Sequence, residues 1–114
     1  MVVDKRSIHG HTVLGIEGVV KLGESARFFA ETLQRVFDQE AGDVIIDLSG
    51  INYMDSTGIG ELVGYLARFQ ERRRRLVLVN PSDRIRKLLE VAQLAPLFPT
   101  FESVAAAVAS APAP

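Results

Sequence analysis

Residues Asp43–Gly60 read DVIIDLSGINYMDSTGIG, and this stretch decides the fold. It begins with an apolar, mostly β-branched run of about six residues, which is typical of a strand buried on both faces at the centre of an α/β sheet. A loop from Ser49 to Ser56 is expected next. Beyond it apolar residues recur at helical spacing, so the hydroxyls of Ser56 and Thr57 are predicted to lie on the first turn of a helix.

These hydroxyls allow two interpretations. Asp55, Ser56 and Thr57 are all good N-cap residues, and a cap of this kind contributes about 1 kcal/mol to helix stability. A serine at the start of a helix is also suited to accept a phosphate, because free N–H groups and the positive end of the helix dipole favour added negative charge there. Spacing alone leaves both interpretations open.

Three segments carry a resemblance to a known family: INYMDSTGIGELVGYL, RLVLVN and RIRKLLEVAQLAPLF. They resemble the STAS domain of bacterial anti-sigma factor antagonists of the SpoIIAA type, over about Val13 to Val108. The resemblance implies an α/β STAS fold, with a mixed, mostly parallel sheet of roughly four to five strands and about four helices. It also implies that Ser56 is the phosphorylated serine, with Thr57 as second choice. The loop expected to contact the partner comprises Asn52, Met54, Asp55, Thr57, Gly58 and Ile59.

The function implied by the resemblance is a binding module that is switched by phosphorylation. Unmodified, it would sequester an anti-sigma factor, usually a GHKL-type serine kinase, and so free the sigma factor. A serine phosphatase would reset the switch, and ATP and magnesium would belong to the kinase. Many family members carry G-E-L/I-D after the second strand, where this chain has Gly18-Val19-Val20-Lys21. Lys21 in place of the acid favours an alternative, a STAS scaffold of stressosome-like or transporter-associated type without a dedicated kinase.

Length and composition set further limits. The 114 residues suit one domain, expected over residues 1–110 with a flexible tail at 111–114. Thirteen basic and fourteen acidic residues give a net charge of −1, so neither nucleic acid nor a membrane surface is an expected partner. The chain lacks cysteine and any apolar stretch long enough to span a membrane, which favours the cytoplasm. A monomer or weak dimer is expected.

The rest of the chain completes an alternation of strands and helices. Residues 2–9 and 12–20 are predicted to form a hairpin, followed by a helix from about Gly23 to Gln39 with Phe29, Leu33, Val36 and Phe37 on one apolar face. Leu76–Val79 is a buried strand, and a helix follows Asn80-Pro81-Ser82-Asp83. A short edge strand is expected within Leu94–Phe98. Thr100 is predicted to cap the last helix, and Arg72–Arg75 to be a solvated helix end.

Other functions fit the residue inventory less well. No base is available by sequence for Ser56 or Thr57, and Asp47 and Asp55 lack the extra acidic pair of a receiver domain, so no enzyme activity and no cofactor are expected. His9 and His11 are too few for a closed metal site. Gly58, Gly60 and Gly64 do not match a dinucleotide fingerprint, but glycines on successive helical turns predict close approach by another group.

Overall fold

The computed structural model describes residues 1–110, so the tail expected at 111–114 lies outside the described residues. The elements are β1 (Val2–Ile8), β2 (His11–Val20), α1 (Glu24–Gln39), β3 (Val44–Met54), α2 (Ser56–Glu71), β4 (Leu76–Val79), α3 (Asp83–Val91), the 3-10 helix η1 (Ala95–Leu97), β5 (Thr100–Phe101) and α4 (Val104–Ala109).

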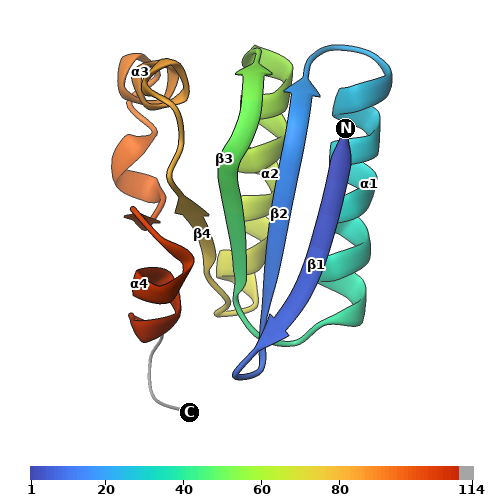
Figure 1. Ribbon diagram of the computed structural model, residues 1–114, viewed down its shortest axis with the longest axis vertical. Coiled ribbons are helices and arrows are strands. Elements are labelled where there is room, and N and C mark those ends of the chain that lie inside the picture. Colours follow the sequence, from blue (N-terminus) through green and yellow to red (C-terminus); the bar gives the residue numbers. More distant parts are fainter. Residues whose placement is uncertain (111–114) are drawn as a thin grey trace.

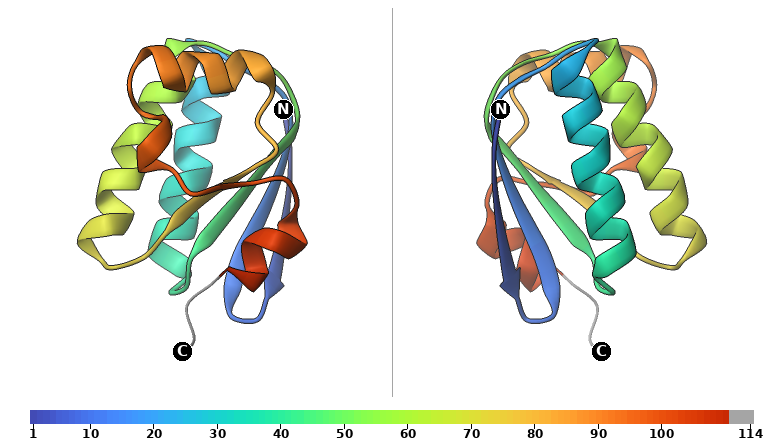
Figure 2. Two further views of the ribbon diagram at one scale, coloured as in Figure 1. Left: turned by 90° about the vertical axis from the view of Figure 1, so that its left-hand side faces the viewer. Right: turned by 90° about the vertical axis from the view of Figure 1, so that its right-hand side faces the viewer.

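The strands form one five-stranded sheet in the order β1-β2-β3-β4-β5. β1 pairs antiparallel with β2, and the other three pairings are parallel, an arrangement that can be followed in Figure 1. Figure 2 shows α1 and α2 side by side on one face of the sheet and α4 on the other. The mixed, mostly parallel α/β sheet predicted from the sequence is therefore confirmed.

The predicted hairpin joins β1 to β2 through a two-residue turn. Its central residues, His9 and Gly10, have φ values of 51° and 81°. Two successive positive φ angles give a turn whose twist matches that of the flanking strands, and glycine adopts such an angle without strain.

The main core lies between the sheet and the pair α1 and α2. The predicted apolar face of α1 is buried as expected, with Phe29 and Leu33 fully enclosed, whereas the neighbouring Phe28 is 42% exposed. The rings of Phe37 on α1 and Phe69 on α2 meet edge to face, with centroids 5.2 Å apart. Burying each such side chain contributes about 1.5–3 kcal/mol, so this layer fixes both helices on the sheet.

β3 is longer than predicted, and the prediction of a loop from Ser49 to Ser56 is wrong, because most of that segment belongs to the strand. The strand runs on to Met54, because β2 continues to pair with it as far as Val20 opposite Met54. A register irregularity between Gly15 and Glu17 lets the pairing continue. Gly50 lies opposite this irregularity, and a side chain there would be crowded, since its Cβ would lie 2.7 Å from the Cγ of Glu17 and 3.0 Å from the carbonyl oxygen of Ile16. The sheet therefore reaches almost to the start of α2, and only Asp55 separates the two elements.

The C-terminal segment also differs from the prediction. The edge strand is Thr100–Phe101, beyond Pro99, and it pairs in parallel with β4. Thr100 therefore does not cap the last helix. Ser103 does, because its Oγ accepts a hydrogen bond from the N–H of Ala106 at 3.1 Å.

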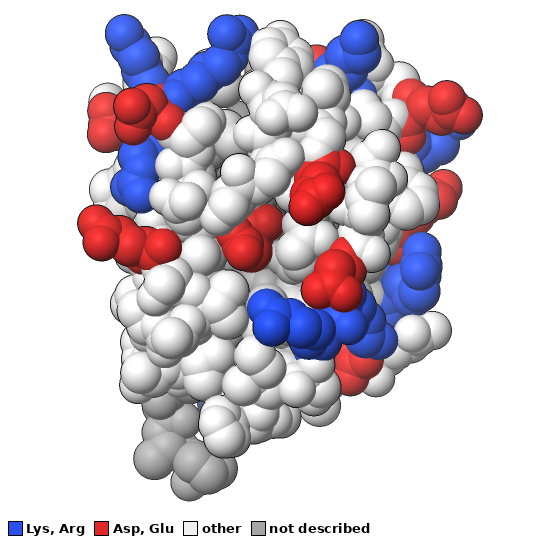
Figure 3. Space-filling view, in the orientation of Figure 1, with Lys and Arg blue, Asp and Glu red and all other residues white. Residues whose placement is uncertain are grey.

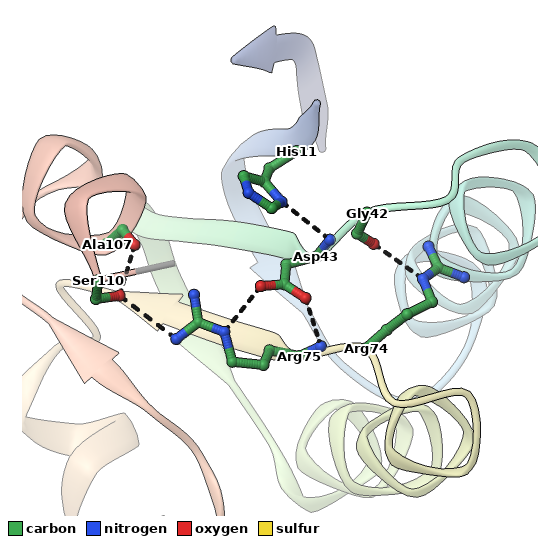
Figure 4. Close-up of polar contacts among 7 residues, drawn as sticks. All are labelled: His11, Gly42, Asp43, Arg74, Arg75, Ala107 and Ser110. Carbon is green, nitrogen blue, oxygen red and sulfur yellow. Dashed lines mark hydrogen bonds and ion pairs between the residues drawn. The ribbon is translucent and has the colours of Figure 1, made fainter. Parts of the chain in front are cut away.

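A polar cluster secures the start of β3, at the opposite end of this strand from Ser56 (Figure 4). Asp43 accepts hydrogen bonds from the backbone N–H and the Nε of Arg75, both at 2.8 Å. Arg74 donates to the carbonyls of Gly42 and Phe37, and its guanidinium stacks over the rings of Phe37 and Phe69. The prediction of a solvated arginine run is therefore wrong for Arg74 and Arg75, which are half-buried.

Candidate functional site at the start of α2

Asp55 caps α2. Its backbone is extended, and its Oδ1 accepts hydrogen bonds from the N–H groups of Thr57 at 2.9 Å and Gly58 at 3.1 Å. The interpretation of Ser56 as the cap is therefore wrong, because Ser56 is the first residue of the helix itself. The prediction that both hydroxyls lie on the first helical turn is confirmed.

Ser56 presents its hydroxyl to solvent. The residue is exposed, and its side chain makes no hydrogen bond within residues 1–110. It opens a helix of 16 residues, whose N-terminal partial charge favours an added anion. The hydroxyl is thus accessible at the positive end of the helix dipole, although the N–H groups of Thr57 and Gly58 already donate to Asp55.

The same aspartate holds the connection between β2 and α1. Its Oδ2 accepts a hydrogen bond from the backbone N–H of Leu22 at 2.9 Å, and its own N–H donates to the carbonyl of Val20 at 3.1 Å. Sequence reasoning missed Leu22, since this contact links residues 33 positions apart and uses a backbone group that no side-chain pattern reveals. The Leu22 side chain is 77% exposed next to the site.

These contacts set the charge state of Asp55. The hydrogen bond from Leu22 is the largest cause that lowers the pKa of this carboxyl below its ordinary value of 3.8, and those from Gly58 and Thr57 add to it. Partial desolvation acts in the opposite direction but does not reverse the shift. Asp55 is therefore a carboxylate throughout the physiological range, and it carries a fixed negative charge beside Ser56.

Three of the residues predicted to contact a partner lie in the interior. Met54 is fully buried, Gly58 is buried, and Ile59 is 7% exposed. A Cβ on Gly58 would lie 2.6 Å from the Cγ of Met54 and 2.9 Å from the Cγ1 of Val20. Close approach is thus confirmed at Gly58, and these residues support the site from beneath.

Elsewhere the glycine prediction fails. Nothing lies within 4 Å of a Cβ built on Gly60 or Gly64, so the expected close approach there is wrong within this domain. Of the remaining predicted contact residues, Asn52 is exposed, while Asp55 and Thr57 are half-buried.

A shallow hollow of about 370 Å³ adjoins the site between the N-terminal halves of α1 and α2. It is lined by Leu22, Gly23, Ala26, Arg27, Ala30, Thr57 and Glu61. Figure 3, which shows the face seen in Figure 1, has acidic and basic side chains interspersed over that face.

Within residues 1–110, no three His, Asp or Glu side chains come together in a way that could hold a metal ion. Across the same residues, no helix combines the length and the apolar character needed to cross a membrane.

The comparisons with known proteins identify the family to which this mixed α/β fold belongs. The chain belongs to this family, because the STAS domain model matches residues 3–107. Over 60 residues it is 42% identical to an anti-sigma-B factor antagonist of Listeria monocytogenes. That match covers 52% of this chain and 53% of the Listeria protein, so the chain spans about half the length of the curated relatives it matches.

Solved structures agree on the fold. An anti-sigma factor antagonist from Mycobacterium paratuberculosis superposes with a TM-score of 0.83 at 17% identity, over 96% of this chain and 92% of that one. Unphosphorylated SpoIIAA gives a TM-score of 0.78 at 19% identity, over 94% and 93% of the two chains. The phosphorylated form of SpoIIAA from Bacillus gives a TM-score of 0.74 at 18% identity, over 95% of this chain and 97% of that one.

Proposed function

We propose that this chain is an anti-sigma factor antagonist, a cytoplasmic binding module without enzymatic activity. Unmodified, it docks on an anti-sigma factor of the GHKL serine-kinase type and thereby releases a sigma factor. The observation that carries the proposal is Ser56, an exposed hydroxyl on the first turn of a long helix. The name of the Listeria relative and the existence of a phosphorylated form of SpoIIAA support it.

The switch is electrostatic. A phosphate on Ser56 adds about −1.5 to −2 charges next to the carboxylate of Asp55. The carboxylate of Asp55 repels the phosphate, and it already accepts the backbone N–H groups of Leu22, Thr57 and Gly58, so these donors are not free to bind the phosphate. In a docked complex the phosphate would have to be buried against the partner without an ion pair, and such burial is strongly unfavourable. Phosphorylation therefore ends the interaction, and a serine phosphatase restores it.

The proposed contact surface combines exposed and half-buried positions around Ser56. We expect Asn52, Asp55 and Thr57 to touch the partner, because they are exposed or half-buried, and the buried Met54, Gly58 and Ile59 to hold this surface in shape. ATP and magnesium are supplied by the kinase.

Calorimetric titration of the kinase with two Ser56 variants tests the proposal. Ser56→Ala cannot be phosphorylated and should bind within about threefold of unmodified wild type, whereas Ser56→Asp should bind about a hundredfold more weakly. Ser103→Asp is the matched control, because it adds the same charge at a helix start, retains a good N-cap residue and immediately precedes α4, which lies across the sheet from α1 and α2. Equal affinities of the Ser56→Ala and Ser56→Asp variants would refute the proposal.

A further inference from the structure

One carboxylate joins the proposed phosphorylation site to the β2–α1 connection, residues 21–23. Oδ1 of Asp55 caps α2 through Thr57 and Gly58, while Oδ2 accepts the N–H of Leu22. The two bonds to the helix stay within one turn. The bond to Leu22 joins separate elements, and we call it the Asp55–Leu22 latch.

The residues on either side of Leu22 are held to α1, since the N–H of Ala26 donates to the carbonyl of Lys21 and the N–H of Arg27 to that of Gly23. Gly23 has a φ of 113°, occupies the N-cap position of α1 and supplies no side-chain hydrogen bond. No atom lies within 4 Å of a Cβ built on Gly23. Lys21 exchanges hydrogen bonds with the hydroxyl of Ser25, which belongs to the start of α1 and gives no link to α2. Asp55 also donates its N–H to the carbonyl of Val20, at the end of β2. Within residues 1–110, the latch is the hydrogen bond that ties residues 21–23 themselves to the start of α2.

We infer that Asp55 is a positioning residue and that phosphorylation of Ser56 opens the latch, releasing residues 21–23 from α2. This inference rests on the proposed modification of Ser56. A phosphate dianion on the neighbouring residue repels the carboxylate and competes with it for the N–H groups of the first helical turn. The bond to Leu22 yields first, because it joins two separate elements, whereas the bonds to Thr57 and Gly58 lie within the helix that Asp55 caps.

The consequence falls on the surface proposed for docking. Leu22 and Thr57 line the same hollow between α1 and α2. Releasing Leu22 therefore moves a large apolar side chain at the edge of the contact surface. Phosphorylation would then change the shape of this surface as well as its charge.

Amide NMR of the ¹⁵N-labelled protein tests the latch without any kinase or partner, since phosphoserine can be introduced at position 56 during translation. We expect the Leu22 amide proton to lose its downfield shift and to exchange about tenfold faster or more in the phosphorylated chain. Asp55→Asn should have the same effect on Leu22, because an asparagine whose oxygen caps α2 presents an NH₂ group to the Leu22 N–H. Phosphoserine at Ser103 is the control and should leave Leu22 unchanged.

A pH titration of unmodified wild type adds a measurement that needs no variant. Lowering the pH should shift the Leu22, Thr57 and Gly58 amides together as Asp55 becomes protonated. If Leu22 does not follow the other two, or if its exchange in the Ser56-phosphorylated chain stays within twofold of the unmodified chain, the inference is wrong. Failure of partner binding in the calorimetric test would leave these NMR results unaffected, so the two proposals fail separately.

Discussion

Substitutions at Gly58 test whether the start of α2 is packed as tightly as the structure indicates. An alanine Cβ there would lie 2.6 Å from Met54 and 2.9 Å from Val20, and both neighbours are fully buried. Overpacking of this kind costs about 1–3 kcal/mol, and the better helix propensity of alanine returns about 1 kcal/mol. We therefore expect Gly58→Ala to be neutral to destabilising, by up to about 2 kcal/mol.

Valine at the same position should be clearly worse. Its two extra methyl groups have no space, and its branched Cβ is stiff in a helix, so we expect a loss of at least about 2 kcal/mol. For a domain of this size, that loss lowers the melting temperature by roughly 10 °C. Thermal and urea unfolding followed by circular dichroism measure both quantities.

Gly60→Ala is the matched control, two positions further along the same helix. A Cβ at position 60 would have no atom within 4 Å, so alanine should stabilise the domain by about 0.4–1 kcal/mol. The reasoning would be refuted if Gly58→Ala stabilised the protein as much as Gly60→Ala, or if Gly58→Val left the unfolding midpoint unchanged.

Three further predictions concern charge and capping. Ser56→Ala should change the free energy of unfolding by less than about 0.5 kcal/mol in urea titrations, since Asp55 is the cap. Folding lowers the pKa of Asp55, so the stability that this carboxylate contributes should be complete above pH 3.8, the ordinary pKa, and should be lost as the pH falls through the folded-state pKa. In the Asp55→Asn variant, the free energy of unfolding should depend less on pH over this range. Asp43→Ala should cost about 2–3 kcal/mol in thermal unfolding, because the Arg75 side chain it leaves unpaired is only 25% exposed.

Patterns within short segments of the sequence predicted the buried strand β3 and the apolar face of α1. The apolar run at Val44 and the helical spacing of Phe29 and Leu33 correspond to a buried strand and a helix face, since a long run with no polar alternation is stable only when covered on both sides. The position of Ser56 on the first turn of α2 follows from the same periodicity.

What the sequence could not supply depends on partners distant along the chain. β3 extends to Met54 because β2 pairs with it that far, and polar residues such as Asn52 conceal this extension. Asp55 is the cap among three suitable neighbours because β3 ends at Met54 and α2 begins at Ser56, and these boundaries depend on how far β2 pairs with β3. A glycine pattern cannot separate Gly58, which meets two side chains, from Gly60, which meets none.

The central claim is that Ser56 is the phosphoacceptor of a partner switch. The most direct test is to incubate the chain with the proposed partner kinase and ATP, and to map the modified peptide by mass spectrometry. We expect a single phosphate on Ser56 and none on the Ser56→Ala variant. Phosphate on Thr57 or Ser49, or continued modification of the Ser56→Ala variant, would contradict it.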